Sequence, residues 1–301
     1  MSELNHILKR ATVFSDSGKE VIAYYDSLED YFEEVYNEDL IKEVGYLASQ
    51  RHPEKWTGCK SYTAFPELMR KGDLIEAREV ETAAEFDKNK TESRFSFIHD
   101  VSGAFVDVGV FMSGEPECMV SFGEVEQQNS YVTLVFEMFE SARIDRSALE
   151  VRAQAVKSVV DTLEGNGVRC RILSVCRIKH SFSGRNWSLF IKIKDFEDPL
   201  NDNLLNFSWP SMYRVGFFAW LEQANRPYSK FCDQRGYGLP RESQMQHHEL
   251  SGAYDWTGER VFYLAAISND AKIEKLIKSG YQSVAEEMLR RISNGESNFI
   301  E

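Results

Sequence analysis

The pattern of apolar and polar positions predicts an α/β unit over residues 131–196. The segment YVTLVFEMF (131–139) is almost entirely apolar or β-branched, which is typical of a strand buried on both faces. Apolar residues then recur every three or four positions between Leu149 and Leu163, the spacing of one face of a helix. Ser147 and Glu150 have the spacing of a capping box. The pattern therefore predicts a buried strand followed by a helix.

Two alternating segments follow the predicted helix. RCRILSVCRI (169–178) and SLFIKIKDF (188–196) are joined by a polar segment that contains glycine, which predicts an antiparallel hairpin. Lys192 and Lys194 in the second strand suit the edge of a sheet, where charge discourages pairing with other chains. We therefore expect an open α/β sheet with residues 188–196 at its edge.

This order of elements resembles the start of the von Willebrand factor A fold, whose third strand is an antiparallel edge strand. In that family a D-x-S-x-S motif after the first strand holds a divalent metal ion. The matching positions here are Glu137, Phe139 and Ser141, and phenylalanine cannot coordinate a metal. We expect an open mixed sheet with helices on both faces, von Willebrand factor A-like or Rossmann-like, without this metal ion.

The remaining segments predict how the chain is divided. Residues 1–94 are predicted to be a mostly helical N-terminal extension, because apolar residues recur at helical intervals over residues 28–44, between many carboxylates. The α/β domain is predicted over residues 95–301. Prolines and glycines indicate an irregular insertion at about 225–259, and residues 260–268 read as another buried strand. Helical patterns follow that strand.

Candidate chemistry lies in the glycine-rich segment 95–122. Its polar side chains form one candidate set: Asp100, Ser102, Asp107, Glu115 and Glu117. These residues could surround a hard cation such as Mg²⁺ or Mn²⁺, or act as a general acid and base. Alternatively, the glycines form sharp turns and the carboxylates cap them. The sequence leaves both interpretations open, although an Asp-Val-Ser-Gly string matches only the first part of D-x-S-x-S.

Charge and composition narrow the classes of function. A net charge of −13 and a pI of about 5.1 argue against non-specific binding to nucleic acid or to an anionic membrane. The five cysteines include no C-x-x-C pair, which fits a reducing compartment. No apolar run reaches 18 residues, and the first residues lack a signal-peptide pattern. We expect a cytosolic protein that binds no membrane.

Three strings carry a second resemblance: VDVGVFMSGEPECMV, IDRSALEVRAQAVKSVVDTLEGNGVR and IKIKDFEDPLNDNLLNFSWPSMYRVGFFAWLE. They resemble an uncharacterised family encoded mainly by tailed bacteriophages and their prophages, over residues 56–222. The family pattern of Asp-x-Pro-Leu, an apolar segment, a proline and a basic residue is similar to Asp198, Pro199, Leu200, Pro210 and Arg214, except that Asp198 directly precedes Pro199. The resemblance implies a phage-encoded protein in a bacterial host cytoplasm, with no known activity.

Three functional hypotheses follow. The first is a non-catalytic interaction protein, an adaptor or inhibitor that acts on host or phage machinery through a protein partner. The second is a metal-dependent enzyme or factor of nucleotide or nucleic-acid metabolism that uses the carboxylates between Asp100 and Glu117. The third is a structural component of the virion. We favour the first, which requires no cofactor; the sequence indicates neither the partner nor the oligomeric state.

Overall fold

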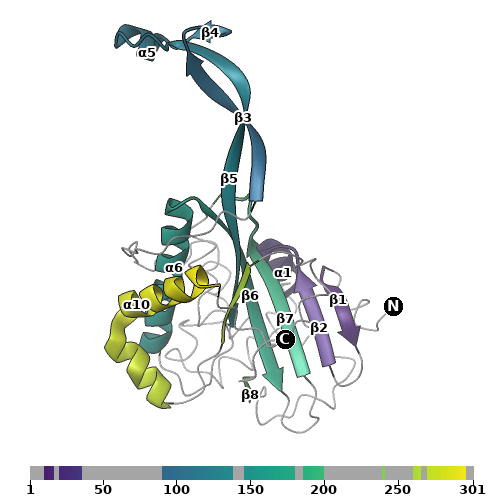
Figure 1. The fold of residues 1–301 in the computed structure, drawn as a ribbon. Helices are drawn as coiled ribbons and strands as arrows, with labels where there is room; N and C mark the ends of the chain where they lie inside the picture. The colour runs from purple at the N-terminus through teal and green to yellow at the C-terminus, as the bar shows by residue number, and fades with distance from the viewer. Residues whose placement is uncertain are drawn as a thin grey trace. The chain divides into compact units, whose positions relative to one another are not determined.

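The computed structural model describes residues 10–16, 20–35, 90–137, 146–179, 186–199, 239–240, 260–265 and 270–295 (Figure 1). The chain divides into two compact units. We call Met1–Glu85 with Val132–Glu301 the sheet unit, and Phe86–Tyr131 the hairpin unit. Strand β5 (Met119–Glu137) contributes its first part to the hairpin unit and its last part to the sheet unit.

The sheet unit contains a mixed sheet whose strands follow the order β1-β2-β7-β6-β5, with β9 also paired to β5. The strands besides β5 are β1 (Thr12–Asp16), β2 (Glu20–Tyr25), β6 (Val168–Lys179), β7 (Asn186–Lys194), β8 (Leu239–Pro240) and β9 (Arg260–Leu264). Strands β2 and β7 are parallel, as are β5 and β9, whereas β6 and β7 are antiparallel. The short β8 pairs with the end of β6. The predicted α/β class is confirmed.

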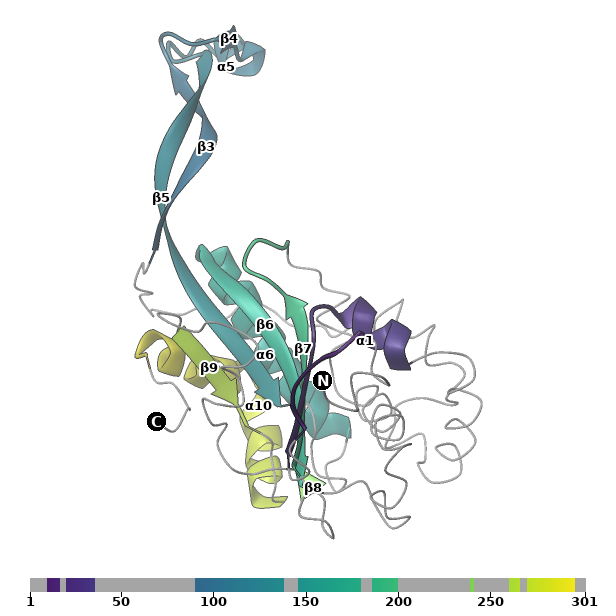
Figure 2. The same cartoon turned by 90° about the vertical axis from the view of Figure 1, so that its right-hand side faces the viewer.

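The central prediction of strand, helix, strand and antiparallel strand is confirmed as β5, α6 (Arg146–Gly165), β6 and β7. Figure 2 shows β5, β6 and β7 with α6 behind them. Residues Tyr131–Glu137 are all buried, as the unbroken apolar run predicts. Helix α6 turns Ala153, Val156 and Val160 into the interior, so the apolar stripe was a reliable signal.

The predicted edge position of residues 188–196 was wrong. Strand β7 has β6 on one side and β2 on the other, in parallel register from Glu20↔Asn186 to Tyr25↔Ile191. The lysines do not protect an edge. Lys194 is buried, and its Nζ lies 3.0 Å from Glu164 Oε1 and donates to the Cys170 carbonyl oxygen. A buried, paired lysine has the same sequence signature as an exposed lysine at an edge.

The N-terminal strands β1 and β2 are the main difference from the mostly helical region predicted for residues 1–94. Val21–Tyr25 of β2 are buried because the strand lies within the sheet, between β1 and β7. Helix α1 (Leu28–Val35) begins where the amphipathic pattern predicts and packs against β2 and β7. Residues 36–89 and most of the predicted insertion at 225–259 lie outside the described residues.

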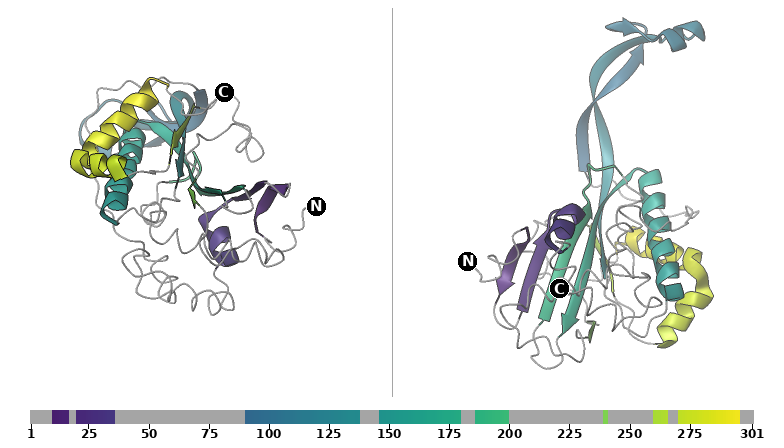
Figure 3. Two further views of the ribbon diagram at one scale, coloured as in Figure 1. Left: turned by 90° about the horizontal axis from the view of Figure 1, so that it is seen from below. Right: turned by 180° about the vertical axis from the view of Figure 1, so that it is seen from behind.

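Helices α6 and α10 (Asp270–Ser293) pack against each other (Figure 3). Gly280 has φ +72° inside α10, and it separates two helical segments. Ala285, Met288, Leu289 and Ile292 form the buried face of the second segment. Within the described ranges, no helix is long and apolar enough to cross a membrane.

One core cluster of the sheet unit contains side chains from five strands: β2, β5, β6, β7 and β9. Its buried members are Ile22, Tyr24, Val135, Leu173, Val175, Phe190 and Tyr263, with Val261 and Ala265 packed against it. The cluster brings together residues separated by more than 200 positions in the sequence. The burial of these apolar side chains stabilises the sheet through the hydrophobic effect.

The hairpin unit is built on β3 (Lys90–Asp100), which pairs with β5 in antiparallel register from Lys90↔Asn129 to Asp100↔Met119. Two shorter elements lie at the closed end of this ribbon: β4 (Phe105–Val106) and α5 (Val108–Met112). We call residues 98–120 the tip. Figure 1 shows the twisted ribbon with β4 and α5 at its closed end.

Candidate functional site

The tip is more elaborate than a simple hairpin turn. At Met119 and Val120, strand β5 has β3 on one side and β4 on the other. Two backbone hydrogen bonds of 2.8 Å hold the tip together: Ala104 N donates to Val120 O, and Asp107 N donates to Cys118 O. Val120 is only 3% exposed. The tip is therefore a small three-stranded sheet that holds its own backbone in place.

Gly103 explains how the chain passes from β3 to β4. A Cβ atom at this position would lie 2.6 Å from Val120 O and 2.8 Å from Val120 N. Such distances are too short for any side chain, so the chain crosses directly over the backbone of β5 at Gly103. The glycine predicted as a sharp turn thus has a specific packing reason.

Helix α5 begins at a capping aspartate. Asp107 Oδ1 accepts hydrogen bonds from Gly109 N (3.0 Å) and Val110 N (3.2 Å), which would otherwise lack helical partners. Its Oδ2 lies 3.1 Å from His99 Nε2 on β3. The hydrogen bond with His99, followed by the bond from Val110, holds the pKa of the Asp107 carboxyl below its ordinary value. Asp107 therefore ties α5 to the ribbon.

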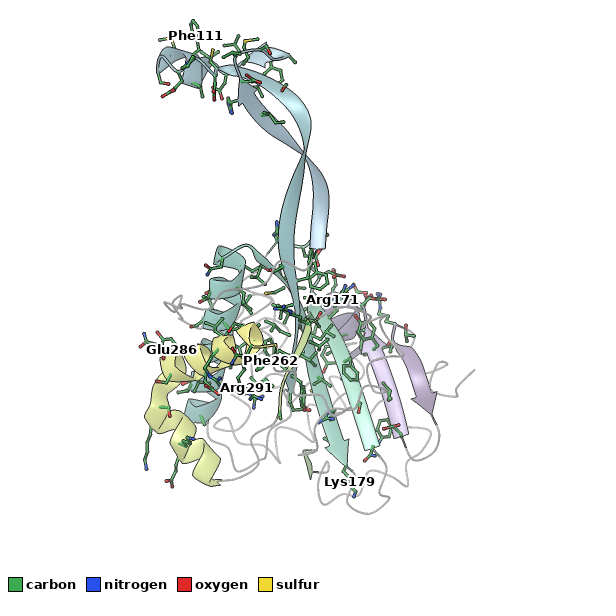
Figure 4. All side chains as sticks on the ribbon, viewed as in Figure 1. Phe111, Arg171, Lys179, Phe262, Glu286 and Arg291 are labelled. Atoms are coloured by element: carbon green, nitrogen blue, oxygen red, sulfur yellow. The ribbon has the colours of Figure 1, made fainter. Side chains whose placement is uncertain are left out.

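The tip exposes its large apolar side chains. Among the described residues, all of the exposed large hydrophobic side chains lie here: Ile98, Val101, Phe105, Val106, Val108, Phe111 and Met112. Phe111 is 59% and Met112 78% exposed. Figure 4 labels Phe111 among the side chains of the tip. A contiguous segment of exposed apolar residues is typical of an interaction site rather than of a free surface.

The region of the tip carries carboxylates and one histidine, His99, but no lysine or arginine. No lysine or arginine occurs between Arg94 and Arg143, a stretch that contains the whole tip. Asp100 precedes the apolar segment, and Glu115 and Glu117 follow it; all three are exposed. The tip therefore combines apolar and acidic side chains without a lysine or arginine, and its histidine, His99, pairs with Asp107.

The five candidate residues predicted from the sequence all lie on the tip, but their side chains have different surroundings there. Asp107 is the helix cap, and its side chain pairs with His99 rather than with another carboxylate. Asp100 Oδ1 accepts from the adjacent Val101 N at 2.6 Å. Ser102, Glu115 and Glu117 are exposed. Among the side chains that the structure describes, no three His, Cys, Asp or Glu residues are grouped to hold a metal ion.

Glu137, the first position of the degenerate metal motif, lies in a buried network of the sheet unit. Its Oε1 accepts from Arg177 N at 3.0 Å, and its Oε2 accepts from Arg177 Nε at 3.1 Å and from Tyr263 OH at 3.2 Å. Glu137 and Arg177 are both fully buried. The carboxylate thus serves a structural ion pair. Phe139 and Ser141 lie outside the described residues.

Arg152 extends this network from helix α6. Its Nη2 donates to the carbonyl oxygens of Glu137 and Leu264, each at 3.1 Å, at the ends of β5 and β9. Burial lowers the pKa of the Arg152 guanidinium to about 10, so it stays charged at neutral pH. Burial, with the nearby Glu137 charge, raises the pKa of the Tyr263 hydroxyl, which remains a neutral donor. The network joins three strands, β5, β6 and β9, and helix α6.

The sequence interpretation named the carboxylates of the tip as the candidate site and did not name its apolar residues. The signal was present: Phe105, Val108, Phe111 and Met112 lie between glycines in a segment without basic residues. Their exposure was not predictable, because apolar residues normally indicate a core.

Comparison with known proteins identifies the family of the chain. Neither the curated proteins nor the solved structures include a significant match. One family profile, described as "Domain of unknown function (DUF7192)", matches residues 5–294. Because the match covers almost the whole sequence, the chain belongs to this family of proteins with a domain of unknown function.

Proposed function

We propose that the protein is a non-catalytic interaction protein, an adaptor or inhibitor, and that it binds a protein partner through the tip of the hairpin unit. The observation that carries the proposal is the concentration of exposed large hydrophobic residues on the tip. Exposed apolar patches of this kind mark binding sites, because leaving them in water is unfavourable.

The composition of the patch supports a protein partner. Phenylalanine and methionine are enriched in the centres of protein–protein interfaces, where their large side chains fill pockets on the partner. Phe105, Phe111 and Met112 are candidates for such anchors. The hydrogen bonds of Ala104, Asp107 and Ser113 fix the backbone that carries them.

The setting of this function is also part of the proposal. The resemblance to a protein family encoded mainly by tailed bacteriophages and their prophages supports a phage-encoded protein that acts on host or phage machinery in the bacterial cytoplasm. The von Willebrand factor A-like topology remains a prediction of the same kind, and so do the metal-dependent and virion alternatives. Our proposal requires neither a metal ion nor a particular topology of the sheet unit.

The experiment is affinity capture from a lysate of the bacteria in which the protein is made. The variant Phe111→Ser with Met112→Ser is compared with wild type and with Glu274→Ser/Lys278→Ser. The control pair lies on α10 and is also strongly exposed, at 72% and 79%. We expect the tip variant to lose at least about 30-fold in affinity for a stoichiometric partner, as hot-spot residues do. Equal capture by all three proteins contradicts the proposal.

A further inference from the structure

We infer that the tip inserts into an apolar groove on its partner and that lysine or arginine side chains line the rim of that groove. This inference deepens the proposed function and rests on it. The groove accommodates the apolar face of α5, formed by Val108, Phe111 and Met112 at helical spacing, and an exposed apolar side chain of β4, where Phe105 and Val106 point to opposite sides of the strand. These five side chains are between 44% and 78% exposed.

The charges of the tip identify the rim. Asp100 lies at the end of β3, immediately before the apolar segment, and Glu115 and Glu117 follow α5. The carboxylates therefore bracket the apolar face along the chain. A partner with basic residues around an apolar centre complements both features, since interfaces combine an apolar core with a polar rim of matching charge.

The same charges disfavour the other occupants of an apolar surface. An anionic membrane repels a tip that carries carboxylates and no lysine or arginine. Nucleic acid is disfavoured for the same reason. The tip of a second copy brings like charges together, and the net charge of the whole chain is −13.

The backbone of the tip is already fixed by its own contacts before a partner binds. The crossing at Gly103, the pairing of β4 with Val120 and the Asp107 cap fix both backbone elements that carry the apolar face. Pre-organisation lowers the entropic cost of association, so a small surface can bind with useful affinity. Carboxylates at the rim then raise the association rate by attracting the basic partner.

The first stage of the test identifies the partner and the contact. A photoreactive benzoylphenylalanine replaces Phe111 in the full chain, with a control at Glu274, and crosslinked proteins are identified by mass spectrometry. The second stage measures association and dissociation rates with that purified partner at 50 to 500 mM salt. The variants are Phe111→Ser/Met112→Ser and the charge-neutral Asp100→Asn/Glu115→Gln/Glu117→Gln.

We expect a protein crosslinked from position 111 and not from position 274. The wild-type association rate should fall with salt, and the charge-neutral variant should associate about tenfold more slowly with a flatter salt dependence. A partner that crosslinks to the tip but shows neither effect overturns the basic rim and leaves the proposed function standing. If no crosslink forms and affinity capture recovers the same proteins with the Phe111→Ser/Met112→Ser variant as with wild type, both fail.

Two further measurements distinguish the other occupants. Sedimentation velocity of the full chain reports self-association, and flotation with phosphatidylglycerol vesicles or with phosphatidylcholine vesicles reports membrane binding. The inference predicts that the tip substitutions change neither measurement. A dimer or a vesicle complex that the Phe111→Ser/Met112→Ser variant abolishes would replace the groove with a second copy or a lipid surface.

Discussion

The interior of the sheet unit and the tip of the hairpin unit treat polar and apolar side chains in opposite ways. In the sheet unit the charged groups of Glu137 and Arg177 are fully buried and bonded to each other. In the tip, Phe111 and Met112 are mostly exposed. A buried charge is costly unless it is paired, whereas a group of exposed apolar side chains is typical of a binding site. The contrast assigns stability to the first region and is the basis on which we propose recognition for the second.

The largest effect on stability is expected for Arg177→Met. This change leaves Glu137 buried without its guanidinium partner, which typically costs about 3–5 kcal/mol. Urea unfolding measures the loss. The control Arg290→Met breaks an exposed pair with Glu287 at 2.8 Å and should cost less than about 1 kcal/mol.

The double variant Glu137→Leu/Arg177→Met sharpens the interpretation. Removing both charges leaves neither buried without a partner, so much of the lost stability should return. Equal losses in Arg177→Met and Arg290→Met would show that the buried network contributes no more than a surface pair.

The next effect is expected for Gly103→Ala within the tip. The added Cβ collides with the Val120 backbone, and overpacking of this kind costs about 1–3 kcal/mol. Hydrogen exchange should accelerate at the amides of Ala104 and Asp107, which bond to β5. The neighbouring Ser102→Ala is the control, because Ser102 is exposed and its side chain loses only a hydroxyl. Unchanged protection in Gly103→Ala contradicts the close crossing.

A smaller, local effect is expected in acid. The pKa of Asp107 is depressed in the folded chain, so its contribution to stability is present above the ordinary value of 3.8 and is lost as pH falls through the folded pKa. We expect the amides of Gly109 and Val110 to lose protection over that range, as followed by nuclear magnetic resonance. Asp107→Asn should remove the pH dependence, and its persistence in that variant would assign it to another group.

The smallest effect on stability is expected for Phe111→Ser with Met112→Ser. Both side chains are exposed, so the free energy of unfolding should change by no more than about 0.5 kcal/mol. In contrast, Phe190→Ala in the sheet core should cost about 3–5 kcal/mol. Thermal and urea unfolding compare the two. A tip variant as unstable as Phe190→Ala would mean that the tip residues form a core.

The sequence predicted the parts of the fold where every local signal has the same cause. The apolar run of β5, the stripe of α6 and the alternation of β6 and β7 reflect burial along one element, and that burial is visible in residue spacing. The segment that contains the tip was also recognised by its glycines, including Gly103. These features depend on neighbours within a few residues.

Pairings between distant segments were decided only by the tertiary structure. Lys194 reads as a residue of an edge strand until β2, more than 160 residues earlier, is placed beside β7. Glu137 reads as a lost metal ligand until Arg177 and Tyr263 surround it. A residue's spacing does not report which distant group it meets, so the roles of buried charges could not be predicted.

The tip shows the same division between sequence and structure. The sequence by itself determined its chemistry, with phenylalanine, methionine and carboxylates and no lysine or arginine from position 95 to 142. Only the tertiary structure decided that these apolar residues face solvent, because β4, α5 and the Gly103 crossing use the ribbon backbone as their support. Composition fixes what a surface can bind, and folding decides which residues form that surface.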